Sequence, residues 1–293
     1  MKWAAVVVNY NAGEHLERCV ASLLADDSTG TPPEVVVVDN ASSDGSADAA
    51  QSVFPSLRLV RARSNRGYSA GANLGIAATS APIVAVCNPD LTVERGTGAA
   101  LANRLEREDD LGAIGPRIRN PDGSTYPSAR RLPDTNDAIG HAFLGWWWPG
   151  NRWTRRYRQV DLDPGAARDA DWISGAAMWL RRSALTGIGG WDERYFMYLE
   201  DVDLCWRLWQ RGWRVAYEPA GIVDHAQGVS TRDHPYRMTI EHHRSTVRFA
   251  ARRWTGLRKL LLVPLVALLS VRAVMVMVAH ALRHRPGNQK VGR

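Results

Sequence analysis

Short apolar runs alternate with amphipathic stretches through the first third of the chain. Four runs have the length and the aliphatic content of β-strands: residues 3–8, 34–38, 57–60 and 83–87. Three stretches between them have helical periodicity: residues 14–24, 42–54 and 68–78. Ser42 or Ser43 is the expected N-cap of the second helix. The alternation predicts an α/β fold built on a largely parallel sheet.

The pattern changes after about residue 119. Asn120-Pro-Asp-Gly123 is typical of a turn. Residues 130–170 are rich in Trp, Arg, Pro and Gly, which predicts long surface loops of the kind that often carry binding function. Apolar character then predicts a strand over 172–180, and helical spacing predicts helices over 200–211 and 234–253.

Three carboxylates, Glu200, Asp201 and Asp203, stand at the expected start of the helix over 200–211. The positive end of a helix favours an ionised carboxylate, which suits a general base. The same residues could be an ordinary acidic helix cap. Because Glu200 and Asp201 are adjacent on a helix, we expect them to point apart, unlike the paired carboxylates of a glycoside hydrolase.

Polar residues also follow the expected strands. Asp39 could accept a hydrogen bond from the N3–H of uracil or thymine, or it could cap the next helix. The glycines of Asn65–Asn73 would let the backbone approach a nucleotide, although the segment has neither phosphate-loop nor dinucleotide spacing. Asp90 could hold Mg²⁺ or Mn²⁺ against a substrate diphosphate, with His225 either a further ligand or a structural residue.

Charge changes the picture at the C-terminal end. The net charge is +7, but eleven of the 37 Lys and Arg residues follow Glu241, after which there is no acidic residue. The rest of the chain contains 26 basic and 30 acidic residues, so the excess of positive charge belongs to the C-terminal region. The three cysteines are far apart and odd in number, which favours a reducing compartment over a disulfide framework.

The basic C-terminal region is also apolar. Residues 260–282 could cross a bilayer by length, but Arg272 near their middle costs about 2.5–3.5 kcal/mol on insertion scales. Basic residues flank both ends, without the one-sided bias of a simple span. We therefore expect a helix or helical pair lying on an anionic membrane surface, with Arg side chains reaching lipid phosphates, and no nucleic-acid partner. The alternative is a buried C-terminal helix.

Several motifs occur together in one order: Val8–Asn11, Asp39–Gly45, Asn65–Gly75, Asn88–Asp90, Trp172–Ala176 and Gly190–Leu204. Over about residues 3–230 the chain resembles the inverting GT-A glycosyltransferases of family 2, and Phe196–Leu204 resembles the rhamnosyltransferase branch. Four further motifs are similar to actinobacterial rhamnosyltransferases that act on polyprenyl-diphosphate-linked N-acetylglucosamine: Tyr126–Arg130, Trp148–Trp153, Tyr157–Gln159 and His242–Thr246.

The resemblance implies a Rossmann-like GT-A fold with a nucleotide-sugar half over 1–118 and an acceptor half over 119–230. Residues 231–293 would form the membrane-associating region, peripheral or monotopic on the cytoplasmic face. The implied donor is dTDP-β-L-rhamnose, the implied acceptor position is the GlcNAc 3-hydroxyl, and the pathway is the arabinogalactan linker of the cell wall. Two alternatives stay open. One is a related enzyme with another donor (galactofuranosyl or mannosyl), and the other is a nucleotide-sugar-binding protein without activity. The sequence does not determine the oligomeric state.

The resemblance also assigns roles to residues. Asp201 occupies the place of the catalytic base. Asp90 and His225 would hold Mg²⁺ or Mn²⁺. The donor nucleotide would contact Asn9, Asp39, Asn65, Arg66 and Asn88. The acceptor would contact Trp172, Ser174, Gly175 and Glu200. Position 88 is Asn where the family usually has Asp, which implies a weaker hold on the ion before the donor diphosphate binds.

Overall fold

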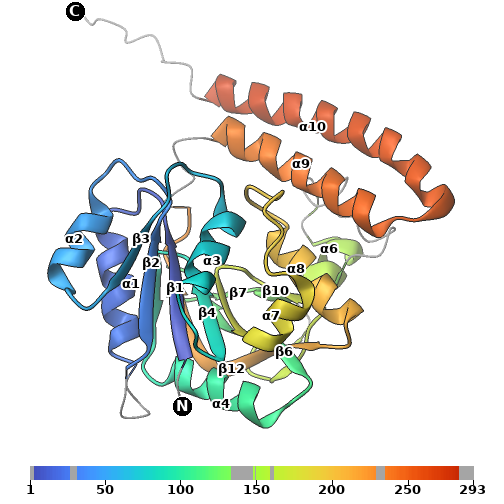
Figure 1. The fold of residues 1–293 in the computed structure, drawn as a ribbon. Helices are drawn as coiled ribbons and strands as arrows, with labels where there is room; N and C mark the ends of the chain where they lie inside the picture. Colours follow the sequence, from blue (N-terminus) through green and yellow to red (C-terminus); the bar gives the residue numbers. More distant parts are fainter. Residues whose placement is uncertain are drawn as a thin grey trace, which may run out of the picture. The chain divides into compact units, whose positions relative to one another are not determined.

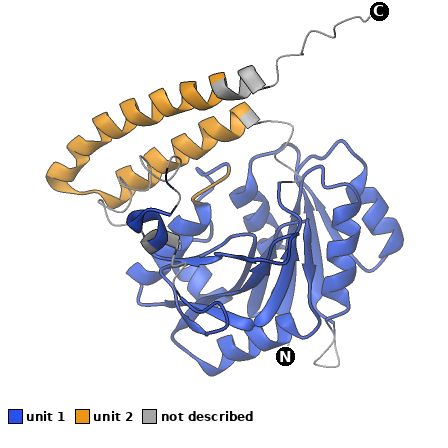
Figure 2. Cartoon of the chain, turned by 180° about the vertical axis from the view of Figure 1, so that it is seen from behind, with its two compact units in different colours: residues 1–196, 200–230 blue, residues 197–199, 231–293 orange. Residues whose placement is uncertain are grey.

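The structure is a computed structural model that describes residues 3–26, 32–132, 148, 150–158, 162–228 and 235–283. The chain forms two compact units (Figure 2), one of residues 1–196 and 200–230 and the other of residues 197–199 and 231–293. The predicted domain boundary after residue 230 falls within 229–234, outside the described residues, as do parts of the predicted loop region, 133–147 and 159–161.

The predicted strands and helices of the first third are present in the first unit (Figure 1). Four strands pair in parallel in the order β3-β2-β1-β4, and the apolar side chains of β1, β2 and β4 are buried on both faces, whereas those of the edge strand β3 are only partly buried. Their bounds are β1 Trp3–Asn9, β2 Glu34–Asp39, β3 Arg58–Arg61 and β4 Ile83–Cys87. The accompanying helices are α1 Glu14–Leu24, α2 Ser46–Val53 and α3 Tyr68–Ala77.

The remainder of the same sheet is mixed, so the prediction of a largely parallel sheet is correct only for its first part. β11 (Ala177–Arg181) runs antiparallel between β4 and β6 (Leu111–Arg119). β12 (Arg214–His225) is parallel to β6 and antiparallel to β5 (Leu91–Val93). Strand direction depends on how the connecting segments return, and the periodicity of a strand does not contain that information.

Two boundaries differ from the predictions for local chemical reasons. Helix α2 begins at Ser46 and not near Ser42, because Asp44 Oδ1 accepts the Ser46 N–H at 3.0 Å and Gly45 takes a φ of 75°. The predicted strand over 172–180 is two strands, β10 (Trp172–Ile173) and β11, which belong to different sheets.

Smaller elements complete the first unit. They are β7 Thr125–Tyr126, β8 Ala129–Arg130, α4 Thr97–Arg107, α6 Arg152–Arg158, β9 Arg168–Asp169, α7 Arg182–Ile188 and α8 Glu200–Gln210. The predicted turn at 120–123 is confirmed by the hydrogen bond from Gly123 N–H to Asn120 O, 2.9 Å long.

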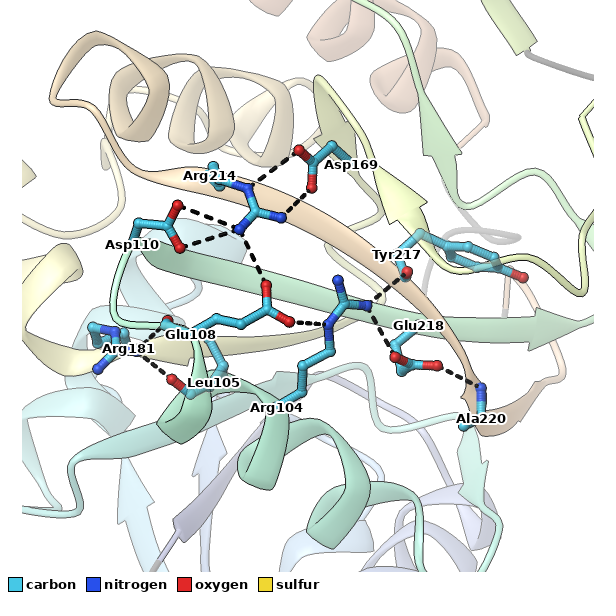
Figure 3. A network of polar contacts seen from close by, with 10 residues as sticks. All are labelled: Arg104, Leu105, Glu108, Asp110, Asp169, Arg181, Arg214, Tyr217, Glu218 and Ala220. Carbon is cyan, nitrogen blue, oxygen red and sulfur yellow. Dashed lines mark hydrogen bonds and ion pairs between the residues drawn. The ribbon is translucent and has the colours of Figure 1, made fainter.

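An ionic network secures the first residues of β12 (Figure 3). Arg214 Nη1 lies 3.1 Å from both Glu108 Oε2 and Asp110 Oδ1, and Arg214 Nη2 lies 2.8 Å from Asp169 Oδ1. Arg104 joins Glu108 to Glu218 with contacts of 2.8 and 2.9 Å. The carboxylate of Asp169, followed by that of Asp110, raises the pKa of the Arg214 guanidinium. The network fixes the strand whose other end carries His225.

The second unit is a pair of helices joined by a short 3₁₀ helix. α9 (Pro235–Arg253) is followed by η1 (Gly256–Leu261) and α10 (Leu262–Arg283), and α10 lies along α9 (Figures 1 and 2). Arg272, on α10, contacts His243 Nε2 at 3.4 Å. His243 Nδ1 lies 2.6 Å from Thr239 O, which can only accept, so Nδ1 carries the proton and Nε2 accepts from Arg272. Burial, with Arg272 adding to it, lowers the pKa of His243.

Candidate active site

Polar residues from three neighbouring parallel strands meet at one edge of the sheet. β1 ends at Asn9, β2 ends at Asp39, and β4 leads directly into Asn88-Pro-Asp90. Asn9 and Asp39 are partners in the strand register. Ligands of open α/β sheets bind beyond these carboxyl ends. The structure therefore brings three predicted donor residues together with the predicted metal ligand Asp90.

The carboxylate of Asp39 is held by the loop that follows it. Its Oδ1 accepts the backbone N–H of Ser42 at 3.2 Å, and its Oδ2 lies 3.5 Å from Arg61 Nη1. The sequence reasoning did not include Arg61, which the parallel pairing of β2 and β3 places opposite Asp39. Asp39 is thus oriented at the strand end where its predicted nucleobase contact would be made.

Asn9 lies beneath the loop that follows β2. Its side chain is fully buried, and Nδ2 donates to the hydroxyls of Ser46 at 3.0 Å and Ser42 at 3.1 Å. Among the described residues, Asn9 Oδ1 has no hydrogen-bond partner. In this structure Asn9 holds the loop after β2, and its contact with a donor stays a prediction.

Asn65 and Arg66 form the approach to α3. Asn65 Oδ1 accepts the Gly67 N–H at 2.9 Å and the Asn40 Nδ2 donor at 3.0 Å, so this side chain shapes the turn. Arg66 is exposed, and its Nη2 lies 2.7 Å from Glu193 Oε2. A guanidinium at this position is accessible to a phosphate, and both donor assignments stay predictions.

Asp90, in the turn between β4 and β5, and His225, the last residue of β12, meet at the same edge of the sheet. Asp90 Oδ1 lies 3.1 Å from His225 Nε2, and Asn88 Nδ2 lies 3.4 Å from the same nitrogen. Both side chains also line an open cavity of about 610 Å³ whose other polar walls include His15, Arg18 and Arg119. No group of three or more His, Cys, Asp and Glu side chains that could hold a metal occurs among the described residues.

The pair nevertheless fits a divalent ion that also binds a substrate diphosphate. Neighbouring ligands of a six-coordinate Mg²⁺, each about 2.1 Å from the ion, lie about 3 Å apart, close to the separation of these two atoms. In this structure Asp90 Oδ1 accepts from His225 Nε2, so an ion bound at that nitrogen would replace its proton. His225 Nδ1 is buried without a partner in the described part of the chain, so no hydrogen bond there opposes the change of tautomer.

The three carboxylates at the start of α8 have different environments. Asp203 is fully buried, and its Oδ2 accepts from Arg207 Nε at 2.6 Å. Arg207 also donates to the carbonyl oxygens of Ile188 and Gly190. Asp203 therefore ties α8 to the loop before it and has a structural role.

Asp201 is held by two backbone N–H groups. Its Oδ2 accepts from Gly175 at 2.9 Å and its Oδ1 accepts from Val202 at 2.8 Å, while part of the residue stays accessible. Burial raises the pKa of Asp201 above its ordinary value, although these N–H groups and the charge of Arg130 oppose the rise. A position at a helix start would by itself lower the pKa, so the direction is opposite to the one expected from the sequence, and desolvation is the reason. A raised pKa makes a carboxylate a stronger base.

Glu200 is the more strongly perturbed of the two. It is 7% exposed, and its Oε2 atom has no hydrogen-bond partner among the described residues. Burial, with the neighbouring charge of Asp201 adding to it, raises the pKa of Glu200 to about 8. The two carboxyl groups thus influence one another although they are adjacent on a helix. The two carboxyl groups therefore titrate as a pair, and Glu200 is the one that holds its proton more strongly.

The predicted acceptor residues lie beside these carboxyl groups. Trp172 is buried, its Nε1 donates to Arg131 O at 3.1 Å, and the Arg130 guanidinium lies 5.0 Å from its ring centre. The backbone N–H of Ser174 donates to Ser128 O at 2.8 Å. Gly175 joins the two halves of the site, because its N–H binds Asp201 while its O accepts from the Tyr68 hydroxyl at 2.6 Å.

Arg130 and Tyr68 were not among the predicted site residues. Arg130 belongs to a motif that carried the resemblance, and that membership was the available signal. Tyr68 likewise lies within Asn65–Gly75, another of the motifs that carried the resemblance. Their proximity to Asp201 depends on contacts between segments more than 50 residues apart.

The family is decided by comparison with known proteins. A profile described as glycosyl transferase family 2 matches residues 4–186. The chain belongs to glycosyl transferase family 2. Two Mycobacterium tuberculosis strains each have a protein called N-acetylglucosaminyl-diphospho-decaprenol L-rhamnosyltransferase that is 42% identical over 262 residues, covering 86% of this chain and 84% of the relative. Rhamnosyltransferase WbbL of Escherichia coli K12 is 39% identical over 83 residues, 28% of this chain and 31% of that protein.

Solved structures of other glycosyltransferases have the same fold as this family 2 enzyme. The mannosyltransferase PcManGT from Pyrobaculum calidifontis, in complex with GDP-Man and Mn²⁺, has a TM-score of 0.57 at 18% identity, covering 97% of this chain and 75% of that chain. TarS residues 1–349 from S. aureus have a TM-score of 0.57 at 13% identity, covering 98% and 75%. These matches confirm the predicted GT-A fold.

Proposed function

We propose that this family 2 glycosyltransferase transfers L-rhamnose from dTDP-β-L-rhamnose to the 3-hydroxyl of GlcNAc on a polyprenyl diphosphate, with inversion at the anomeric carbon. The reaction would build the arabinogalactan linker of the cell wall. Support comes from the extended identity to relatives whose name describes an L-rhamnosyltransferase acting on diphospho-decaprenol-linked N-acetylglucosamine. The fold and the arrangement of its carboxylates are compatible with this reaction.

The observation that carries the proposal is the setting of Asp201. This carboxylate is oriented by two backbone N–H groups, partly accessible, and surrounded by a buried environment that increases its basicity. In the proposed reaction Asp201 accepts the proton of the acceptor hydroxyl. The acceptor oxygen forms a bond to C1 of rhamnose while the bond from C1 to the donor diphosphate oxygen breaks, and dTDP leaves with the electron pair.

Glu200 would bind the acceptor as a neutral carboxylic acid. Its proton lets it donate a hydrogen bond to a sugar hydroxyl or ring oxygen, and its neutrality avoids a second negative charge beside Asp201. The buried indole of Trp172, with the Arg130 guanidinium over it, would form a wall of the acceptor pocket. Protonated Glu200 and ionised Asp201 thus divide binding and proton abstraction between them.

Asp90 and His225 would hold Mg²⁺ or Mn²⁺, and a divalent ion bound to the donor diphosphate stabilises the negative charge that develops on it. Asp39, at the end of β2, would accept from the N3–H of the thymine base. Arg66 is accessible for a phosphate oxygen, and His15, Arg18 and Arg119 add positive or ionisable groups to the cavity beside Asp90.

The second unit would place the enzyme at the cytoplasmic face of the membrane, peripherally or monotopically. One helical stretch, 256–278, is long and apolar enough to cross a bilayer by length and composition. Arg272 is turned towards His243, so the exposed side of the stretch carries apolar side chains. These are Leu257, Leu260, Leu261, Val263, Val266, Val271, Val274, Met275 and Val278. Such a face suits contact with lipid, and Arg258 and Lys259 beside it suit anionic headgroups.

Transfer assays with purified protein test the proposal. Incubation with dTDP-rhamnose and a prenyl-diphosphate-GlcNAc analogue should yield a rhamnosylated product whose mass and NMR spectrum show the 3-linked α-anomer. GDP-mannose and UDP-galactofuranose serve as competing donors, and preferential use of either would replace the proposed donor. Asp201→Asn should lower turnover by about 10²-fold or more while donor affinity is retained. Asp109 is an exposed aspartate just after the end of α4, and Asp109→Asn is the matched control.

A further inference from the structure

Three residues immediately before the carboxylates Glu200 and Asp201 belong to the second unit. Met197–Leu199 group with residues 231–293, whereas Phe196 and Glu200, on either side of them in the chain, belong to the first unit (Figure 2). The segment is therefore where the helix pair makes non-covalent contact with the residues that lead directly into α8. Nothing in the sequence pattern separates these residues from the motif around them.

The segment has a backbone conformation that its residues do not favour. Tyr198 has a φ of 68° and Leu199 a φ of 60°, in the left-handed region where side chains with a Cβ are disfavoured. Neither residue is Gly, Asn or Asp, the types that tolerate this region best. Two consecutive residues of this kind persist only where the surroundings impose them, and such strain concentrates at functional sites.

Contacts from α9 impose this conformation. The hydroxyl of Ser245, which is fully buried, donates to Met197 O at 3.0 Å. The imidazole of His242, one turn earlier on α9, packs edge-on against the Tyr198 ring with ring centres 5.5 Å apart. Both α9 residues lie on one face of the helix, three positions apart. They hold two consecutive residues of the segment.

The first unit fixes the other end of the segment. Phe196 O accepts the backbone N–H of Tyr68 at 2.8 Å. The approach is so close that a Cβ on Gly67 would lie 2.2 Å from the same oxygen. Phe196 is held on one side and α8 begins at Glu200 on the other, so the conformation of Met197–Leu199 acts on the first turn of α8, which carries Asp201.

We propose that Ser245 and His242 are positioning residues for catalysis, which set the Asp201 carboxylate through the strained segment Met197–Leu199. This inference rests on the proposed role of Asp201 as the base. It gives the C-terminal helix pair a second task besides membrane contact, and the two tasks are separable. Loss of positioning should lower the rate of transfer to every acceptor alike, whereas loss of membrane contact should lower the rate for long-chain acceptors.

Ser245→Ala tests the proposal, and Thr246→Ala is its matched control. Thr246 is the next residue on α9, and its hydroxyl donates within the helix to His242 O at 2.8 Å, so its removal does not reach the segment. Because a displacement of about 1 Å can cost 10²-fold in rate, we expect Ser245→Ala to lower kcat by about 10-fold or more. The KM for dTDP-rhamnose and sedimentation with vesicles should equal those of wild type, and the Tm should fall by about 2–4 °C, as expected for one lost hydrogen bond. Ser245→Thr, which keeps the hydroxyl, should restore kcat.

Leu199→Gly gives an independent measurement, since glycine adopts a φ of 60° without strain. This variant should keep its Tm and still lose about 10-fold in kcat, because the segment is no longer rigid. Short-chain and long-chain acceptors should be affected equally in both variants. Wild-type kcat in Ser245→Ala or in Leu199→Gly would overturn the proposal, as would equal losses in Ser245→Ala and Thr246→Ala. Asp201→Asn is measured in parallel. Full activity in Asp201→Asn would show that Asp201 is not the base, and the proposed function would then fail together with this inference. Low activity in Asp201→Asn with wild-type kcat in Ser245→Ala would contradict only the positioning role.

Discussion

Replacing Glu200 with Gln should make the protein more stable, by an amount that depends on pH. The side chain is buried and one of its oxygens has no hydrogen-bond partner in the described part of the chain, so ionisation there is costly. Burial and then the charge of Asp201 raise the pKa of Glu200 from 4.5 to about 8. Glutamine is nearly isosteric with the protonated acid and cannot ionise.

The size of the effect follows from the two pKa values. Between pH 4.5 and 8 the folded protein keeps the Glu200 proton and the unfolded chain loses it, so rising pH favours unfolding across this window and has no further effect above it. A difference of one in pKa corresponds to about 1.4 kcal/mol, which makes the full cost on the order of 5 kcal/mol above pH 8. Glu200→Gln has no such cost, because glutamine does not ionise. The variant's free energy of unfolding should therefore equal that of wild type near pH 4 and exceed it most near pH 9.

Urea unfolding of both proteins in the same detergent, from pH 4 to pH 9, measures this difference in the free energy of unfolding. Comparing variant with wild type cancels contributions from the second unit. Glu106→Gln, an exposed glutamate on α4, is the control and should follow the wild-type curve. If Glu200→Gln also follows the wild-type curve at every pH, Glu200 is ionised in the folded protein and the reasoning is refuted.

Three further outcomes are expected. Asp90→Ala should weaken metal-dependent donor binding in calorimetry, with a milder loss for His225→Ala, and full activity in EDTA would contradict a metal role. Gly67→Ala should cost about 2 kcal/mol or more in urea unfolding, because the new Cβ would overlap a backbone oxygen, whereas Gly13→Ala, with a positive φ but open space around it, should cost less. Deleting residues from 256 onward should release the protein from membranes and impair transfer to long-chain acceptors more than to short-chain ones. Sedimentation of this truncated protein with membranes would exclude the interfacial role.

Local pattern in the sequence was sufficient for the elements of the first third and for the ends of its strands. A run such as Val35–Val38, apolar on both faces, can only be a buried strand, and the polar residue that ends it must lie at the sheet edge. Asp39 and Asp90 were therefore predictable as neighbours of a common site. The family could also be predicted, because its motifs are short, ordered and specific.

Tertiary structure alone decided how the carboxylates differ. Glu200, Asp201 and Asp203 are nearly equivalent in sequence, yet their environments differ. Glu200 has a buried oxygen without a hydrogen-bond partner among the described residues, Asp201 is held by Gly175, and Asp203 is paired with Arg207. Burial and partners come from segments that are distant in the chain, so they override the helix-start effect that the sequence predicts. Contacts with distant segments also explain why the strand predicted over 172–180 is interrupted at Gly175. Periodicity alone predicted a continuous strand there.

The sequence by itself determined the apolar and basic character of the C-terminal region, and with it the candidate for membrane contact. It also placed Arg272 near the middle of that region, where the charge argues against a simple span. Only the structure paired this arginine with His243 and joined α9 to the residues before Glu200. Periodicity records which side of a helix is apolar, whereas the partner of a polar side chain depends on which distant segment packs against it.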